Sequence, residues 1–176
     1  MDINKISSGN NVPNEVNVII EVSMNSSPVK YEFDKETGAL FVDRIIQTSM
    51  YYPCNYGFVP GTLSGDGDPV DVLVVGNFPI VPGAVVAVRP IGVLMMEDES
   101  GIDEKILAVP TTKIDPFYAD IESYKDLPKI LIEKISNFFE NYKKLEKNKW
   151  VKLADWNDAN SAKEIIKVGI KNYIKD

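Results

Sequence analysis

Residues 66–71 read Asp-Gly-Asp-Pro-Val-Asp (DGDPVD) and run directly into Val72-Leu73-Val74-Val75 (VLVV). Gly67 and Pro69 are typical of a turn, whereas the apolar, β-branched run that follows is typical of a buried strand. Ionised carboxylates only accept hydrogen bonds, and neighbouring like charges raise each other's proton affinity. Three aspartates beside a rigid strand therefore need a counter-charge, and Mg²⁺, which prefers oxygen ligands, is the natural candidate.

Two other interpretations of this hexapeptide were compared with a metal site. Asp, Gly and Pro are common turn residues, so the segment could be an ordinary solvated loop. An EF-hand loop requires Gly at its sixth position and Glu at its twelfth. The chain has Asp71 and Asn77 at those positions, which excludes an EF-hand.

The composition is that of a globular protein with an acidic surface. The chain has 176 residues, 44% of them hydrophobic, and a formal net charge of −7. One domain covering residues 1–176 is expected at this length. The negative charge argues against binding to nucleic acid or to an anionic membrane. The sequence contains no histidine, so catalysis would have to use carboxylates, Lys, Arg, Tyr and hard metal ions.

Nothing in the sequence indicates secretion or membrane insertion. Cys54 is the only cysteine, so an intrachain disulfide is excluded. The first eleven residues are polar and lack the apolar segment of a signal peptide. The longest apolar stretch, 84–96, contains Arg89 and Pro90 and is not a membrane span. We expect a soluble cytoplasmic protein.

Periodicity predicts a small β-barrel followed by helices. Short strands joined by Gly- and Pro-rich turns favour a barrel over alternating strands and helices. The expected strands are 16–24, 29–33, 39–46, 72–75, 84–96, 106–109 and 150–156. Pro128 suits the first position of a helix whose apolar stripe is Leu131, Ile135, Phe138, Tyr142 and Leu145. Residues 161–164 fit a capping box for a C-terminal helix that runs to about Lys171.

Further charged and aromatic segments accompany the acidic turn. The 29–46 hairpin carries Lys30, Glu32 and Arg44, residues 51–61 form an aromatic loop, and residues 97–105 form a second acidic loop. Tyrosine hydroxyls can donate hydrogen bonds to anionic oxygens, although such rings are also common in cores.

Together these segments resemble the soluble family I inorganic pyrophosphatases of bacterial type, over nearly the whole chain. The matching motifs are K-Y-E (30–32), F-V-D-R (41–44), Y-Y-P-C-N-Y-G-F-V-P-G (51–61), D-G-D-P-V-D (66–71), the D…D-x-K of Asp98, Asp103 and Lys105, and F-F-E-x-Y-K (138–143). The resemblance implies a five-stranded OB-like barrel with packed helices, including a C-terminal helix. It also implies hydrolysis of pyrophosphate to two phosphates with Mg²⁺, and assembly into homohexamers.

The resemblance also implies a role for each matching residue. Asp66, Asp71 and Asp103 would be metal ligands, Asp98 would help to hold a further metal, and Asp68 would be the base on the nucleophilic water. The phosphates would be contacted by Lys30, Arg44, Tyr56, Lys105, Tyr142 and Lys143. Glu21, Glu32 and Tyr52 would have supporting positions.

Two hypotheses of other classes remain open at this stage. An OB-type module could bind nucleic acid or an oligosaccharide through Tyr51, Tyr52 and Tyr56 near Arg44, but such modules use a basic groove. Alternatively, the acidic turns could be solvated loops on an inert domain, which would predict no stabilisation by Mg²⁺.

Overall fold

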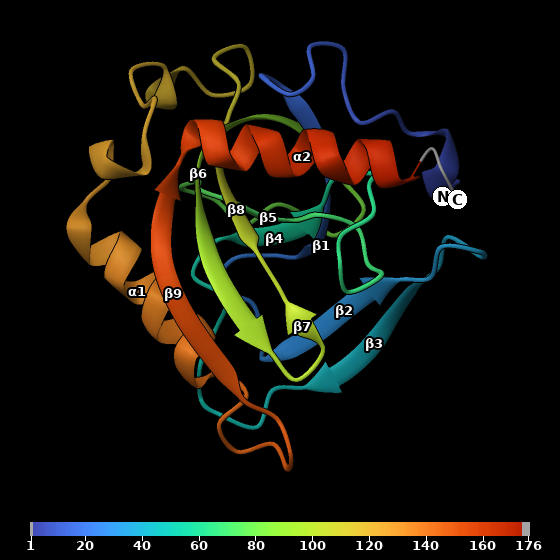
Figure 1. Cartoon of the computed structure of the whole chain (residues 1–176), viewed down its shortest axis with the longest axis vertical. Coiled ribbons are helices and arrows are strands. Elements are labelled where there is room, and N and C mark those ends of the chain that lie inside the picture. Colours follow the sequence, from blue (N-terminus) through green and yellow to red (C-terminus); the bar gives the residue numbers. More distant parts are fainter. Residues whose placement is uncertain (1, 174–176) are drawn as a thin grey trace.

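The computed structural model describes residues 2–173, and its dominant element is a seven-stranded sheet (Figure 1). The strands of this sheet are β1 (Val16–Val22), β4 (Asn55–Phe58), β5 (Asp71–Val74), β6 (Val85–Asp98), β7 (Gly101–Ile102), β8 (Lys105–Pro110) and β9 (Val151–Asp158). A separate hairpin consists of β2 (Val29–Phe33) and β3 (Leu40–Ile45). The helices are α1 (Lys129–Asn141) and α2 (Ala159–Tyr173), with short 3-10 turns at Ile3–Lys5, Pro116–Tyr118 and Tyr124–Asp126.

Five strands close into a barrel. They follow the order β1-β4-β5-β8-β6, and β1 also pairs with β6, so the ring has no free edge at that point. Only the β5–β8 pairing is parallel among these strands. The long strand β6 additionally pairs with β7 and β9. The expected five-stranded barrel with packed helices is confirmed.

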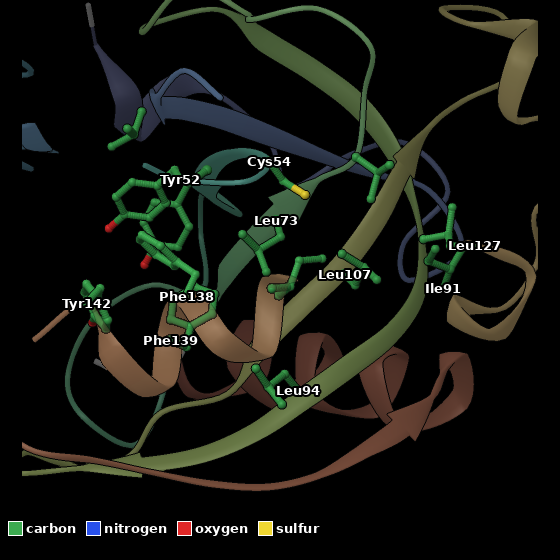
Figure 2. Packing of buried hydrophobic residues seen from close by; sticks show 14 of the residues in the cluster. Tyr52, Cys54, Leu73, Ile91, Leu94, Leu107, Leu127, Phe138, Phe139 and Tyr142 are labelled. Atoms are coloured by element: carbon green, nitrogen blue, oxygen red, sulfur yellow. The ribbon is translucent and has the colours of Figure 1, made fainter. Parts of the chain in front are cut away.

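The two helices cover different parts of the barrel, and the strands alternate between them. In β5, Leu73 faces the apolar cluster that includes Phe138 of α1, whereas Val72 and Val74 face the cluster that includes Ile166 of α2. Figure 2 shows Leu73, Leu107, Phe138 and Phe139 among the residues of one apolar cluster. In Figure 1, α2 crosses one end of the barrel and α1 lies alongside β9. The β-branched run after the acidic turn is therefore buried on both faces, as predicted.

The expected acidic loop 97–105 is mostly a hairpin, because β6 extends to Asp98, β7 is Gly101–Ile102 and pairs with it, and β8 begins at Lys105. Three further local predictions were wrong. First, Pro128 is the N-cap of α1 rather than its first residue, and the helix ends at Asn141, so Leu145 lies beyond it with 67% of its surface exposed. Second, α2 begins at Ala159, and Asp158 Oδ1 accepts hydrogen bonds from Ser161 N and Oγ, so the capping box at 161–164 does not exist. Asp158, rather than Ser161, caps the helix because it stands directly before the first helical residue.

The third error concerns the aromatic segment 51–61, which is not only a loop. Residues 55–58 form β4, which pairs with both β1 and β5. A Cβ on Gly57 would lie 1.9 Å from the carbonyl oxygen of Ile19, so only glycine permits the approach of β4 to β1. Alternation was hidden here because all four residues of β4 are buried.

None of the helices within residues 2–173 combines the length and apolar composition that crossing a membrane would require.

Candidate active site

A charged cleft of about 280 Å³ lies where the β2–β3 hairpin, the 66–71 turn, the β6–β8 region and the end of α1 meet. All of the predicted site residues except Tyr52 line it. They are Glu21, Lys30, Glu32, Arg44, Tyr56, Asp66, Asp68, Asp71, Asp98, Asp103, Lys105, Tyr142 and Lys143. Segments that are more than 100 residues apart in the sequence thus contribute to one concave surface.

The 66–71 turn holds its aspartates at the rim of this cleft. Gly67 has a φ of +91°, a conformation that glycine adopts without strain, and Asp66 Oδ1 accepts a 3.0 Å hydrogen bond from Asp68 N. Burial and then the nearby Asp68 and Asp71 charges raise the pKa of Asp66, although the Asp68 N–H opposes the shift. The Asp68 side chain is 72% exposed and its Oδ1 lies 3.0 Å from Lys35 Nζ.

Lys105 is the buried cation at the centre of the acidic cluster. Parallel pairing of β5 with β8 places Asp71 opposite Lys105, whose Nζ lies 2.5 Å from Asp71 Oδ2 and also contacts Asp103. Burial lowers the pKa of Lys105, but Asp71 and Asp103 outweigh it and hold that pKa well above its ordinary value. Burial raises the pKa of Asp103, against the effect of Lys105. The ammonium therefore partly neutralises two carboxylates that face the same space.

A second buried pair in the cleft consists of Lys143 and Asp98. Lys143 Nζ lies 2.5 Å from Asp98 Oδ2, and Ser100 N donates a 2.7 Å hydrogen bond to Asp98. Burial opposes ionisation of Asp98, but these two hydrogen bonds lower its pKa below the usual value. Glu99 bridges Lys143 and Lys149, at 3.5 and 3.2 Å.

The β2–β3 hairpin contributes the third group of charges. Lys30 and Arg44 face each other in the register of the two strands, and Asp43 Oδ2 lies 3.3 Å from Lys30 Nζ and 3.2 Å from Arg44 Nη1. Glu32 also contacts Lys30. Burial disfavours the charge on Lys30, but Tyr52 and Glu32 together raise its pKa.

The tyrosines lie against the core side of the cleft. Tyr56 and Tyr142 are both about 4% exposed, and burial raises the pKa of each well above 10. They are therefore neutral hydroxyls that can donate hydrogen bonds. Tyr52 instead packs in the aromatic core beside Phe138 (Figure 2). Its ring centroid lies 5.0 Å from that of Tyr56 and 4.6 Å from that of Phe138. Tyr52 packs against the ring of Tyr56 and is not among the residues that line the cleft.

Glu21 is a buried carboxyl at the edge of the cleft. It is 7% exposed, and Phe33 N donates a 2.8 Å hydrogen bond to its Oε1. Burial raises its pKa to about 8, against the effect of the Phe33 N–H.

Several lining residues were not found from the sequence. They are Phe33, Lys35, Asp43, Phe58, Pro69, Glu99, Ser100 and Lys149. Asp43 and Glu99 are direct sequence neighbours of Arg44 and Asp98. That adjacency could have indicated that they also line the cleft. Lys35 and Lys149 carried no such signal, because their positions depend on how the hairpin turn and the segment after α1 fold over the cleft.

Within residues 2–173, no three acidic or thiol side chains are grouped as a ready-made metal cage. Asp71 and Asp103 instead share a lysine ammonium. The donor set around this space is nonetheless all oxygen, which suits hard divalent cations.

Comparison with known proteins gives a consistent result. The family model described as inorganic pyrophosphatase matches residues 18–174. The chain is 63% identical to an inorganic pyrophosphatase of Rickettsia typhi over 157 residues, covering 89% of this chain and 88% of the relative. It is 56% identical to one from Caulobacter vibrioides over 173 residues, covering 98% of each.

Solved structures agree with this result. An inorganic phosphatase from Anaplasma phagocytophilum superposes with a TM-score of 0.95 at 60% identity, covering 97% of this chain and 99% of that one. The inorganic pyrophosphatase from Thermus thermophilus gives a TM-score of 0.93 at 40% identity, with 99% of both chains covered. With sequence, fold and cleft in agreement, this chain belongs to the inorganic pyrophosphatase family of hydrolases.

Proposed function

We propose that this chain hydrolyses pyrophosphate to two phosphates, with Mg²⁺ bound by the cleft aspartates and with the phosphates held by its lysines, arginine and tyrosines. The observation that carries the proposal is the convergence of Asp66, Asp71 and Asp103 with Lys30, Arg44 and Lys105 in one cleft. A polyanionic substrate needs cations, and divalent cations need carboxylates. Both sets line the same cleft of about 280 Å³.

The residues present fit divalent cations. Asp71 and Asp103 already surround one positive charge, the ammonium of Lys105, so their oxygens converge on a space suited to a cation. Asp66 and Asp98 line the same cleft, and all four offer carboxylate oxygens. Bound Mg²⁺ would lower the pKa of a coordinated water and offset charge on the phosphates.

The protein's own cations and hydroxyls supply the phosphate contacts. Arg44 can donate two parallel hydrogen bonds to phosphate oxygens, whereas Lys30, Lys105 and Lys143 act as compact point charges. Tyr56 and Tyr142 add neutral donors, because their raised pKa values keep the hydroxyls protonated. These donors make the cleft suitable for an anion despite the net charge of −7.

Asp68 is the base in this proposal. Its exposed carboxylate lies on the same turn as Asp66 and Asp71 but forms its ion pair with Lys35 at the rim, so it can accept a proton from water in the cleft. A positioned base contributes about 10²–10⁴-fold in typical enzymes.

We further propose one domain over residues 1–176, a homohexamer and a cytoplasmic location. The apolar clusters shared by the barrel and its two helices support the first of these, and the family resemblance of the sequence motifs is the basis for the other two.

The proposal is tested by phosphate release from pyrophosphate, measured with Mg²⁺ and then with excess chelator. Rapid release that chelation abolishes is expected. Folded protein that releases no phosphate in Mg²⁺ would contradict the proposed function, and release that persists in chelator would contradict the metal requirement.

A further inference from the structure

Arg44 belongs to the charged cleft but stands on a strand that is otherwise outside the core. Within the described residues, β3 pairs only with β2, and every residue of β3 except Arg44 is exposed. Backbone hydrogen bonds of the barrel therefore do not determine where the guanidinium lies. Its side-chain contacts must do so.

Glu146, in the segment after α1, also contacts Arg44. Its Oε1 lies 3.3 Å from Arg44 Nε, and its side chain is only 12% exposed. Glu146 does not line the cleft itself. Its backbone N–H donates a 2.9 Å hydrogen bond to the carbonyl of Lys143, so Glu146 is tied to the segment that carries two proposed phosphate contacts, Tyr142 and Lys143.

The pair is close but imperfectly aligned. Arg44 Nε and Glu146 Oε1 are both buried, and neither makes a well-aligned hydrogen bond within residues 2–173. Burying charged groups without good partners costs free energy. The two groups are therefore stabilised when they face each other. Asp43 holds Nη1 at 3.2 Å while Glu146 lies beside Nε, so two carboxylates constrain the plane of the guanidinium.

We propose that Glu146 is a positioning residue, which orients the guanidinium of Arg44 so that its fork can engage a phosphate of the substrate. This inference rests on the proposed function, because it assumes that Arg44 binds phosphate. Glu146 acts through Arg44 and does not touch substrate. A planar fork recognises two oxygens only in a narrow range of orientations, so loss of the constraint weakens phosphate binding even though the charge of Arg44 remains.

The test compares Glu146→Gln with the wild-type enzyme and with Glu133→Gln. Glu133 makes an ion pair of the same 3.3 Å length with Lys129 on the exposed face of α1, so it is a matched control outside the cleft. Glu146→Gln is expected to raise KM for pyrophosphate about tenfold, with a smaller change in kcat, because one charged contact behind the binding group is lost. Glu133→Gln is expected to leave both unchanged.

A double-mutant cycle separates positioning from a general structural role. In an Arg44→Met background the guanidinium is absent, so Glu146→Gln should change KM by less than about twofold. An equal change in both backgrounds would overturn the proposal. So would a lower melting temperature with an unchanged KM, since that result would make Glu146 an anchor of the hairpin only.

Two further results would decide between this inference and its alternatives. If Glu146→Gln does not fold, Glu146→Asp retains the charge with a shorter reach, and an unchanged KM in that variant would overturn the proposal. A folded wild-type protein that releases no phosphate would refute the proposed function and this inference together. An active wild type with an unaffected Glu146→Gln would refute the inference alone.

Discussion

At the scale of single residues, the cleft neutralises its acids with buried lysines rather than leaving them charged against one another. Lys105 contacts Asp71 and Asp103, and Lys143 contacts Asp98. The attraction within each ion pair offsets part of the cost of burying its charges. Divalent cations that approach these carboxylates would compete with the ammonium groups, which would then be available to phosphate.

Replacing Asp68 tests the assignment of the base. Asp68→Asn retains the size of the side chain but removes its capacity to take a proton, so kcat should fall about 10²–10⁴-fold. The thermal stabilisation by Mg²⁺ should persist, because Asp68 is not a proposed metal ligand. Steady-state phosphate release and thermal melts measure the two effects. Asp120→Asn, an exposed aspartate outside the cleft, is the control. Near-normal turnover in Asp68→Asn would remove Asp68 from this role.

The raised pKa of Glu21 predicts how the free energy of unfolding depends on pH. Its folded-state value of about 8 exceeds the ordinary 4.5, so the native state binds more protons than the unfolded state between these values. The free energy of unfolding should therefore fall as pH rises from about 4.5 to 8, by up to about 1.4 kcal/mol per pH unit from this group. Glu21→Gln should flatten that slope in metal-free protein.

Denaturant melts of both proteins at several pH values, in chelator, measure the difference. Glu133→Gln is a suitable control because its carboxylate is 54% exposed on α1. Parallel pH dependences in the wild type and in Glu21→Gln would show that Glu21 is not the protonated group.

At the scale of secondary-structure elements, the junction between β9 and α2 shows how a cap sets a boundary. Asp158 ends β9 and accepts hydrogen bonds of 2.9 and 3.0 Å from Ser161 N and Oγ. Asp158→Ala should lower the free energy of unfolding by about 1 kcal/mol, because an N-cap interaction at the start of α2 is lost. Chemical denaturation measures the loss.

Asp120→Ala serves as the surface control for this substitution, with an expected change within about 0.5 kcal/mol. Equal stabilities of Asp158→Ala and wild type would show that α2 is held by packing alone. That packing centres on Ala162 and Ile166, which are fully buried in the cluster beneath the helix.

Strands and helices differed in how well the sequence predicted them. β2 of the separate hairpin and the apolar runs of the barrel strands β5, β6 and β8 were predicted within a few residues, because alternation and buried apolar runs are simple local patterns. β4 was not predicted, since its four buried residues lie inside an aromatic segment that resembles a loop. Leu145 was wrongly placed on the stripe of α1, because the helix ends at Asn141 and a turn follows.

At the scale of the whole molecule, metal binding should stabilise the fold as well as support catalysis. Ligands that bind only the native state stabilise it by about 2.7 kcal/mol at a concentration 100 times Kd. Mg²⁺ should therefore raise the melting temperature of the wild-type protein. The increase should be much smaller for Asp71→Asn, which loses one of the carboxylates that line the cleft. Thermal melts with Mg²⁺ and with chelator measure both.

Asp120→Asn is again the control and should be stabilised like the wild type. Identical Mg²⁺-dependent shifts in Asp71→Asn and in the control would contradict the placement of the metal at this cleft. An absence of any shift in the wild type would favour the inert-domain interpretation instead.

The sequence by itself determined the barrel class, the acidic turn and the residue types of the cleft, because motifs and strand periodicity are local properties. The signature at 66–71 and the cations around it could be recognised without coordinates. Only the tertiary structure decided which acidic and basic side chains contact each other. The register of β5 against β8 places Lys105 beside Asp71, folding of the segment after α1 brings Glu146 to Arg44, and Tyr52 turns into the aromatic core. Such contacts depend on barrel closure and side-chain packing between distant segments, which no local pattern encodes.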